Sequence, residues 1–214
     1  MDYIEHDGDV THIWHNSKMI ESVKTKRGTL IEMVERPYWG LTCYMNNSIQ
    51  SCTLDEHIYH EALVTPVMSN QVKSVLIIGG GEGATAREVL KWPVECVDMY
   101  EWDEEVVQLF QKYPQWSKGA WDDKRLHVYY EDIFTVNITK KYDAIIVDLF
   151  EPNEQWITLM DRVQKWSNSI VSYAGMRHAN VIHEMWRGIP IDVPITYKYI
   201  PSFLGESSFF RCKF

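Results

Sequence analysis

The 214-residue sequence lacks an excess of basic residues, a closely spaced cysteine pair and an apolar run long enough to cross a bilayer. Lysine and arginine number 21 against 30 aspartates and glutamates, a formal charge of −9. This argues against nucleic acid as a partner, because phosphates are bound by basic surfaces. A membrane-spanning helix needs about 20 apolar residues, so no membrane partner is expected. The first residues are acidic, without the apolar core of a signal peptide.

The four cysteines are widely spaced and form no Cys-x-x-Cys motif, which argues against a disulfide framework and a zinc knuckle. A reducing cytoplasm is therefore the expected compartment. Two histidine pairs at i, i+3, His12 with His15 and His57 with His60, have a spacing that allows chelation on a helix. No third ligand follows either pair at a recognisable distance, so we expect no metal site.

Residues 1–52 predict a small N-terminal β-region. Segments 29–35, 41–45 and 48–52 are rich in β-forming residues, and Asn46-Asn47 predicts a turn between the last two. The pattern changes at residue 53. There Thr53, followed three residues later by Glu56, has the form of a capping box and predicts a helix to about residue 67.

Buried strands and amphipathic helices alternate from residue 73 onward. Strands are expected at 74–78, 95–100, 126–130 and 142–147, with helices at 84–91 and from Asp103 onward. In the second helix Val106, Phe110 and Tyr113 have the spacing of one core-facing stripe. This alternation predicts an α/β fold with a Rossmann-like, doubly wound and mostly parallel sheet.

Three of these segments end in residues suited to a nucleoside pocket. The first strand runs into Gly79-Gly80-Gly81, a loop that lets the backbone approach a ligand closely. Glu101 ends the next strand, where it can accept hydrogen bonds from both hydroxyls of a ribose. Asp132 follows the third strand, within reach of an adenine edge. The alternative is that Glu101 and Asp132 only cap helices.

Glu82 is an unusual residue within a glycine loop. Its carboxylate would repel a pyrophosphate, so a dinucleotide fits poorly, and it would attract a cation instead. At ~4 Å and an effective dielectric near 20, one such charge pair is worth on the order of 4 kcal/mol. The acidic excess of the chain has two interpretations, an acidic cavity or a solvated acidic face, and Glu82 favours the cavity.

These motifs together resemble the spermidine synthase family, the polyamine aminopropyltransferases. The resemblance covers residues 28–152 and 200–210, with the motifs in the family's order. They are Gln50, Asp55-Glu56-x-x-Tyr59-His60-Glu61, Val75-Leu76-Ile77-Ile78-Gly79-Gly80-Gly81-Glu82-Gly83, Arg87-Glu88-Val89-Leu90, Glu101-x-Asp103, Asp122-Asp123-x-Arg125, Asp132 and Tyr142-Asp143-x-Ile145-Ile146-x-Asp148-x-x-Glu151-Pro152. The glutamate form of the loop is similar to the agmatine and thermospermine branches.

The resemblance implies a fold of the S-adenosylmethionine methyltransferase type. It also implies transfer of an aminopropyl group from decarboxylated S-adenosylmethionine, a co-substrate, to a cationic amine such as putrescine, agmatine or a longer polyamine. The product 5′-methylthioadenosine would be released, and no prosthetic group is implied. Family members pair through the N-terminal β-region, so a homodimer is expected.

Site roles follow from the resemblance by position. The nucleoside side of the donor would be bound by Gly79, Gly80, Gly81, Glu101, Asp103, Asp132 and Ile133. The aminopropyl ammonium would be bound by Glu82. The acceptor amine would contact Gln50, Tyr59, His60 and Glu151. Asp148 would be the catalytic base.

Elementary chemistry also favours a carboxylate in the place of Asp148. A sulfonium leaves as a neutral thioether, so no general acid is required. An alkyl amine with a pKa near 10.4 is protonated at pH 7, so its lone pair must be freed before it attacks. A buried carboxylate at a strand end can hold the ammonium and accept its proton.

Several positions depart from the family pattern. Thr29 stands where the family has a glutamine, and the gatekeeping loop expected after Pro152 is replaced by a different sequence. The family's C-terminal helices are missing, so residues 53–214 are expected to form a C-terminally shortened, Rossmann-like catalytic domain. Two alternatives remain open. One is an S-adenosylmethionine-dependent N-methyltransferase, and the other is a non-catalytic paralogue that binds nucleoside or polyamine.

Overall fold

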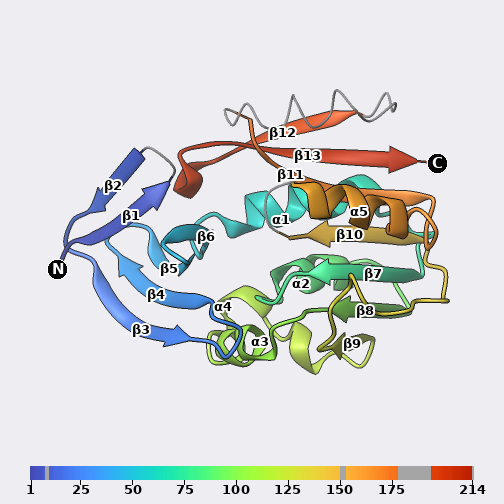
Figure 1. Ribbon diagram of the computed structural model, residues 1–214, viewed down its shortest axis with the longest axis horizontal. Coiled ribbons are helices and arrows are strands. Elements are labelled where there is room, and N and C mark those ends of the chain that lie inside the picture. The colour runs from blue at the N-terminus through green and yellow to red at the C-terminus, as the bar shows by residue number, and fades with distance from the viewer. Residues whose placement is uncertain (8–9, 150–152, 178–193, 214) are drawn as a thin grey trace.

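The computed structural model describes residues 1–7, 10–149, 153–177 and 194–213. Within these ranges the chain forms three β-sheets, and helices cover both faces of the largest (Figure 1). None of the described helices is both long and apolar enough to cross a membrane.

The largest sheet has seven strands in the order β12-β13-β11-β10-β7-β8-β9. These are β12 (Ile195–Ile200), β13 (Gly205–Lys213), β11 (Ser169–Met176), β10 (Ala144–Asp148), β7 (Ser74–Gly79), β8 (Cys96–Tyr100) and β9 (Leu126–Tyr129). Strands β11, β10, β7, β8 and β9 run parallel, and β13 is antiparallel to both of its neighbours. The expected Rossmann-like, mostly parallel sheet is therefore confirmed.

Alternate side chains of the central strands build two cores, because successive residues of a strand point to opposite faces. On one face Val75 and Ile77 pack with α1 (Glu56–Val64), the short helix η1 (Thr65–Val67) and α2 (Ala84–Leu90). On the other face Leu76 and Ile78 pack with α5 (Glu154–Val163). This double burial explains why the sequence of β7 is a continuous apolar run.

The N-terminal β-region consists of two small antiparallel sheets. One is the hairpin β1 (Tyr3–Asp7) with β2 (Val10–Trp14), and the other contains β3 (Lys18–Lys24), β4 (Leu30–Arg36), β5 (Gly40–Met45) and β6 (Ser48–Cys52). Ile31 and Met33 of β4 share a core with Val106 and Phe110 of α3 (Glu104–Gln111), and Tyr113 packs against it. The stripe expected on this helix is therefore confirmed. The division of the chain at residues 52 and 53 stays a prediction.

The start of α1 differs from the sequence-based expectation. The predicted capping box was wrong: Thr53 lies in a turn, and α1 begins at Glu56 with Asp55 at the N-cap. The Glu56 carboxylate instead bonds to Arg87 and His60. Asp55 accepts a hydrogen bond from the backbone N–H of Ser202, 2.6 Å away. Buried partners distant in the sequence have replaced the local cap.

The remaining short helices complete the fold. They are α4 (Pro114–Ser117), η2 (Ala120–Asp122) and η3 (Pro201–Phe203). Trp116 of α4 is fully buried in the core beneath the N-terminal sheet, and its indole N–H donates to the Ser51 hydroxyl of β6 at 2.7 Å. Since η3 follows β12 and contacts the start of α1 through Ser202, it lies close to the elements that build the site described next.

Candidate active site

The site lies where β7 and β10 end. In an open α/β sheet the connections leave a crevice at the position where the strand order reverses, and ligands bind there, at the carboxyl ends of the strands. In this sheet the reversal falls between β7 and β10. Their last residues, Gly79 and Asp148, are paired in register.

Close contacts require glycine at two positions, the last residue of β7 and a position in the loop that follows it. A Cβ atom on Gly79, which has a φ of +81°, would collide with the backbone carbonyl of Asp148. A Cβ on Gly81 would lie 2.9 Å from the Oε2 atom of Glu101 and 2.8 Å from Val106. The loop therefore passes tightly between the ends of β10 and β8, and any larger residue would push these strand ends apart.

Asp148 is held by two hydroxyl groups. The Tyr59 hydroxyl of α1 donates to its Oδ1 at 2.9 Å, and the Thr85 hydroxyl in the first turn of α2 donates to its Oδ2 at 2.5 Å. Burial, followed by the nearby Asp148 charge, raises the pKa of Tyr59 well above its usual value. Tyr59 thus remains a phenol, and it orients an acceptor-only carboxylate at the strand end.

A chain of charges runs from the glycine loop into the protein. His60 Nε2 lies 2.5 Å from Glu82 Oε1, and His60 Nδ1 lies 2.9 Å from Glu56 Oε2. Both oxygens of Glu56 are bonded by the Arg87 guanidinium at 2.8 Å. These four side chains are nearly inaccessible to solvent; that of Glu82 is the most exposed, at 13%.

The four side chains of this charge chain, Glu82, His60, Glu56 and Arg87, shift one another's pKa values. Burial alone would lower the pKa of His60, but the Glu82 and Glu56 carboxylates outweigh burial and raise it to about 10. For Glu56, the hydrogen bonds and charges of His60 and Arg87 outweigh burial and lower the pKa to about 2. Burial raises the pKa of Glu82, although His60 opposes it. The imidazole is therefore a buried imidazolium between two carboxyl groups.

Gln50, Tyr59 and His60, which were expected at the amine channel, line one small crevice together with Ser202 and Phe203. Tyr59 also contacts the ring of Phe203, with ring centroids 6.1 Å apart. The Gln50 side chain is exposed and bonds to backbone carbonyls of its own strand. The structure brings these three residues together, and their contact with an amine stays a prediction.

The expected nucleoside residues lie along the ends of β8 and β9. Glu101 is 8% exposed, and its Oε1 accepts from the backbone N–H of Asp103 at 3.0 Å. Burial raises its pKa to about 7. Asp103 is the N-cap of α3 and also accepts from the Thr25 hydroxyl at 2.7 Å. Its carboxylate therefore stabilises the start of α3 and the contact of this helix with Thr25.

Asp132 and Ile133 follow β9. The Asp132 carboxylate accepts from the backbone N–H of Phe134 at 2.9 Å, a short-range turn contact, and its side chain remains partly exposed. Ile133 is 5% exposed and packs in the core on the α5 face of the sheet. Nucleoside contact by these two residues stays a prediction.

Comparison with known proteins identifies the family of this chain. The family model described as the spermine/spermidine synthase domain matches residues 56–162. A polyamine aminopropyltransferase of Korarchaeum cryptofilum is 30% identical over 226 residues, covering 97% of this chain and 70% of the relative. The chain belongs to the spermine/spermidine synthase family.

A polyamine aminopropyltransferase of Saccharolobus solfataricus is 44% identical over 186 residues, covering 83% of this chain but 62% of the relative. Among solved structures, spermidine synthase from Thermotoga maritima matches with a TM-score of 0.83 at 24% identity, covering all of this chain and 79% of that one. A spermidine synthase in complex with the transition state analogue AdoDATO matches at 0.84 and 23% identity, with 100% and 80% covered. At these identities the solved structures show the fold alone.

Within this family member, sequence reasoning missed three site residues. Thr85 bonds to Asp148, and Glu56 with Arg87 holds His60 from behind. Glu56 and Arg87 belong to the motifs that carried the resemblance, yet nothing in their spacing of 31 positions indicates that they pair. Glu151, expected to hold the amine, lies outside the described residues.

The histidine pairs are also placed by the structure. His12 lies in β2, and His15 follows in the turn beyond it, where a spacing of three does not bring two side chains onto one strand face. In α1 both ring nitrogens of His60 lie against carboxyl oxygens. His60 is therefore part of the charge chain.

Proposed function

We propose that this chain is a polyamine aminopropyltransferase. It transfers the aminopropyl group of decarboxylated S-adenosylmethionine to an amine acceptor, such as putrescine, agmatine or a longer polyamine, and releases 5′-methylthioadenosine. The single observation that carries the proposal is the pair of carboxyl groups, Asp148 and Glu82, beside the point where the strand order reverses. Two acidic groups at a crevice suit a cationic donor and a cationic acceptor.

The proposed reaction is a direct displacement. The lone pair of the acceptor nitrogen attacks the methylene carbon next to the sulfonium, and the carbon–sulfur bond breaks with its electrons going to sulfur. The leaving group is a neutral thioether, and the proton lost from nitrogen passes to Asp148 as general base. Tyr59 and Thr85 orient the carboxylate for this transfer. No prosthetic group takes part.

Binding of the donor is proposed at the other strand ends. Glu101 accepts from the ribose hydroxyls across the glycine loop formed by Gly79, Gly80 and Gly81, which Glu101 already contacts closely at Gly81. Asp103, Asp132 and Ile133 complete the nucleoside side. Glu82 binds the aminopropyl ammonium, and its charge would disfavour the carboxylate that intact S-adenosylmethionine carries there.

Binding of the acceptor is proposed at the crevice lined by Gln50, Tyr59 and His60, with Glu151 anchoring the same amine. Support comes from the shared lining of these three residues and from the hydrogen bond that joins Tyr59 to Asp148. This bond supports a proposed acceptor channel beside the proposed base. A small cationic amine is the proposed partner molecule.

A donor test separates this function from its alternatives. The protein is incubated with decarboxylated S-adenosylmethionine and each of putrescine, agmatine and spermidine, and 5′-methylthioadenosine is measured by chromatography. The expected result is acceptor-dependent release, which should be about 10²–10⁴-fold slower in Asp148→Asn. Methylation of an amine by intact S-adenosylmethionine, without release from the decarboxylated form, would establish the methyltransferase instead. Binding of 5′-methylthioadenosine without any turnover would establish a non-catalytic paralogue.

We also propose a cytoplasmic homodimer. The first hairpin of the N-terminal β-region exposes Ile4 and Ile13, which are paired across β1 and β2 on one face and are each about half exposed, and neighbouring exposed apolar side chains suit an interaction surface. Every cysteine of the chain is free, which fits a reducing compartment. Light scattering after gel filtration should give twice the chain mass of 25.2 kDa, and Ile13→Lys should lower it to the monomer.

A further inference from the structure

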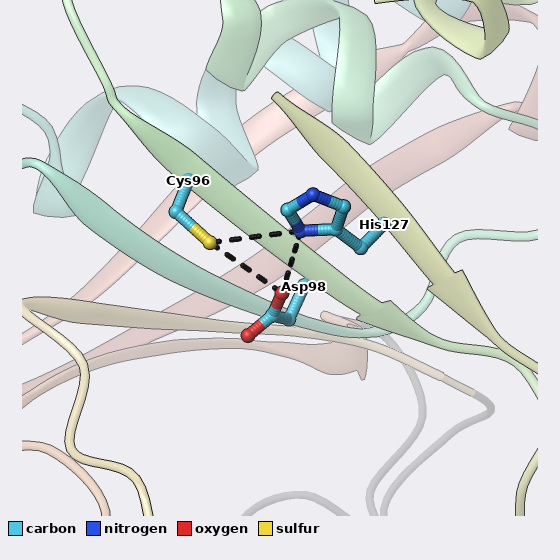
Figure 2. A group of neighbouring side chains, drawn as sticks. All are labelled: Cys96, Asp98 and His127. Carbon is cyan, nitrogen blue, oxygen red and sulfur yellow. Dashed lines mark hydrogen bonds and ion pairs between the residues drawn. The ribbon is translucent and has the colours of Figure 1, made fainter. Parts of the chain in front are cut away.

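We propose that Cys96, Asp98 and His127 form a binding site for a zinc-type divalent metal ion. These side chains come from the two neighbouring strands β8 and β9 and point toward one another on one face of the sheet (Figure 2). The site is distinct from the active site: Cys96 and His127 lie near the amino ends of β8 and β9 and Asp98 lies in the middle of β8, whereas Gly79, Glu101 and Asp148 lie at or beyond the carboxyl ends of their strands.

The sheet geometry explains the convergence. Cys96 and Asp98 are two residues apart in β8, so both project from the same face of the sheet. His127 of β9 is directly opposite Asp98 in the parallel register. One thiol, one carboxylate and one imidazole therefore share a single patch of the sheet. Sulfur, nitrogen and oxygen donors together form the ligand set that zinc prefers.

The distances between the donor atoms fit a tetrahedral ion. A tetrahedron with metal–ligand bonds of about 2.0 to 2.3 Å has edges of roughly 3.3 to 3.6 Å. Cys96 Sγ lies 3.5 Å from Asp98 Oδ1 and 3.7 Å from His127 Nδ1, and the Nδ1 to Oδ1 distance is 3.1 Å. An ion above this triangle would meet all three ligands with small side-chain adjustments and would keep its fourth position for water.

Neighbouring groups fix the carboxylate and leave the site accessible. The other oxygen of Asp98, Oδ2, accepts from the Tyr142 hydroxyl at 2.7 Å. This leaves Oδ1 directed toward Cys96 and His127, and such outer contacts commonly orient metal ligands. The His127 side chain is 51% exposed and Cys96 is partly exposed, whereas the other three cysteines are buried.

Lys140 is the competing cation at this position. Its Nζ lies 3.3 Å from Cys96 Sγ and 2.6 Å from Asp98 Oδ2, and its side chain is 44% exposed. A bound ion would repel this ammonium, which can turn outward to solvent. Removing the charge at Lys140 should therefore raise the affinity for the metal, a response expected of a metal site and not of a simple hydrogen-bonded cluster.

The first test measures binding to the whole protein. Cobalt(II) is titrated into the reduced chain at about pH 7.5, and absorption is recorded, since a tetrahedral Co(II)–thiolate centre gives a near-ultraviolet charge-transfer band and intense visible bands. One equivalent should produce both bands, and zinc should displace the cobalt. Featureless spectra, or bands that persist in Cys96→Ser, would overturn the proposal.

The second test uses matched variants. Cys96→Ser and His127→Gln should each weaken zinc binding by at least about tenfold, and Lys140→Met should strengthen it. His15→Gln is the control, because His15 lies 3.0 Å from Asp2 on the surface and forms an exposed histidine–aspartate pair without a thiol. Equal loss in His15→Gln and His127→Gln, or weaker binding by Lys140→Met, would contradict the site.

A third measurement reports the consequence for the fold. Since the ion would join the edge strand β9 to β8, zinc should raise the melting temperature of the wild-type chain but not that of Cys96→Ser. Circular dichroism of each variant without metal shows whether it is folded. None of the three readouts depends on aminopropyl transfer. A failure of the metal site would therefore leave the proposed function untouched, and a failure of the proposed function would leave the metal site untouched.

Discussion

His60 Nε2 lies 2.5 Å from Glu82 Oε1, so one imidazole joins helix α1 to the glycine loop after β7. Its other ring nitrogen is bound to Glu56, which Arg87 holds from behind. The position of the Glu82 carboxyl group therefore depends on His60 and Glu56 of α1, which are more than 20 positions away in sequence, and on Arg87 of the following helix α2.

The first prediction concerns the pH dependence of stability through His60. Its pKa is raised from an ordinary value of 6.5 to about 10 in the folded chain, so folding favours the protonated imidazole. The resulting stabilisation is fully present below about pH 6.5 and is lost as the pH rises through about 10. Urea denaturation at several pH values should show this decline in the wild type and a much smaller decline in His60→Gln.

The His60 prediction has a surface control. His15→Gln alters an exposed histidine beside Asp2, so its free energy of unfolding should keep the wild-type pH profile. An unchanged alkaline decline in His60→Gln would show that the imidazole is not the group responsible.

The second prediction concerns Glu56. The Glu56→Gln substitution leaves the buried charges of Arg87 and His60 without their shared partner, and breaking such a buried pair costs about 3–5 kcal/mol. Glu61→Gln, on the same helix but exposed and 4.0 Å from Lys91, should change the free energy of unfolding by less than about 0.5 kcal/mol. Urea denaturation at pH 7 measures both, and similar values for the two variants would refute a structural role for the charge chain.

The third prediction concerns Asp148 as the proposed base. Asp148→Asn keeps the shape of the side chain but cannot accept the proton, so kcat should fall by about 10²–10⁴-fold. Binding of 5′-methylthioadenosine, measured calorimetrically, should stay within a few-fold of the wild type. Tyr59→Phe removes one hydrogen bond to the carboxylate and should lower kcat less. Full activity in Asp148→Asn would exclude this residue as the base.

The fourth prediction concerns Glu101, whose pKa burial raises to about 7. The ionised carboxylate is the form that accepts two ribose hydroxyls, and it decreases about tenfold between pH 8 and pH 6. Because 5′-methylthioadenosine is uncharged over this range, its affinity should fall by a similar factor. In Glu101→Gln the affinity should be low and independent of pH. A wild-type affinity that is constant from pH 6 to 8 would disprove the assignment.

The parallel sheet could be predicted from the sequence because its signals are local. The apolar run of β7 and the spacing of Val106, Phe110 and Tyr113 each specify burial within one element. The residues at the strand ends could likewise be placed, since parallel strands present their carboxyl ends at one edge of the sheet. The positions of Glu101 and Asp148 at strand ends needed only this rule, and their proposed roles came from the family resemblance.

The contacts that hold the site could not be predicted, because they join residues distant along the chain. Glu56 looked like a cap residue for Thr53, yet a bidentate contact to Arg87 outweighs that local hydrogen bond. Cys96 and His127 appeared unrelated, because only the register of β8 and β9 brings them together. In both cases the partner of a side chain is set by tertiary contacts, which the local sequence does not specify.

The hydrogen bond from Ser202 to Asp55 spans 147 positions of the chain. The N-cap residue of α1 is thus bonded to a residue that is synthesised long after the helix. Contacts of such separation form late, since closing a long loop costs entropy before it gains any contact. The contact that holds the start of helix α1, which carries Tyr59 and His60, should therefore be among the last to form during folding.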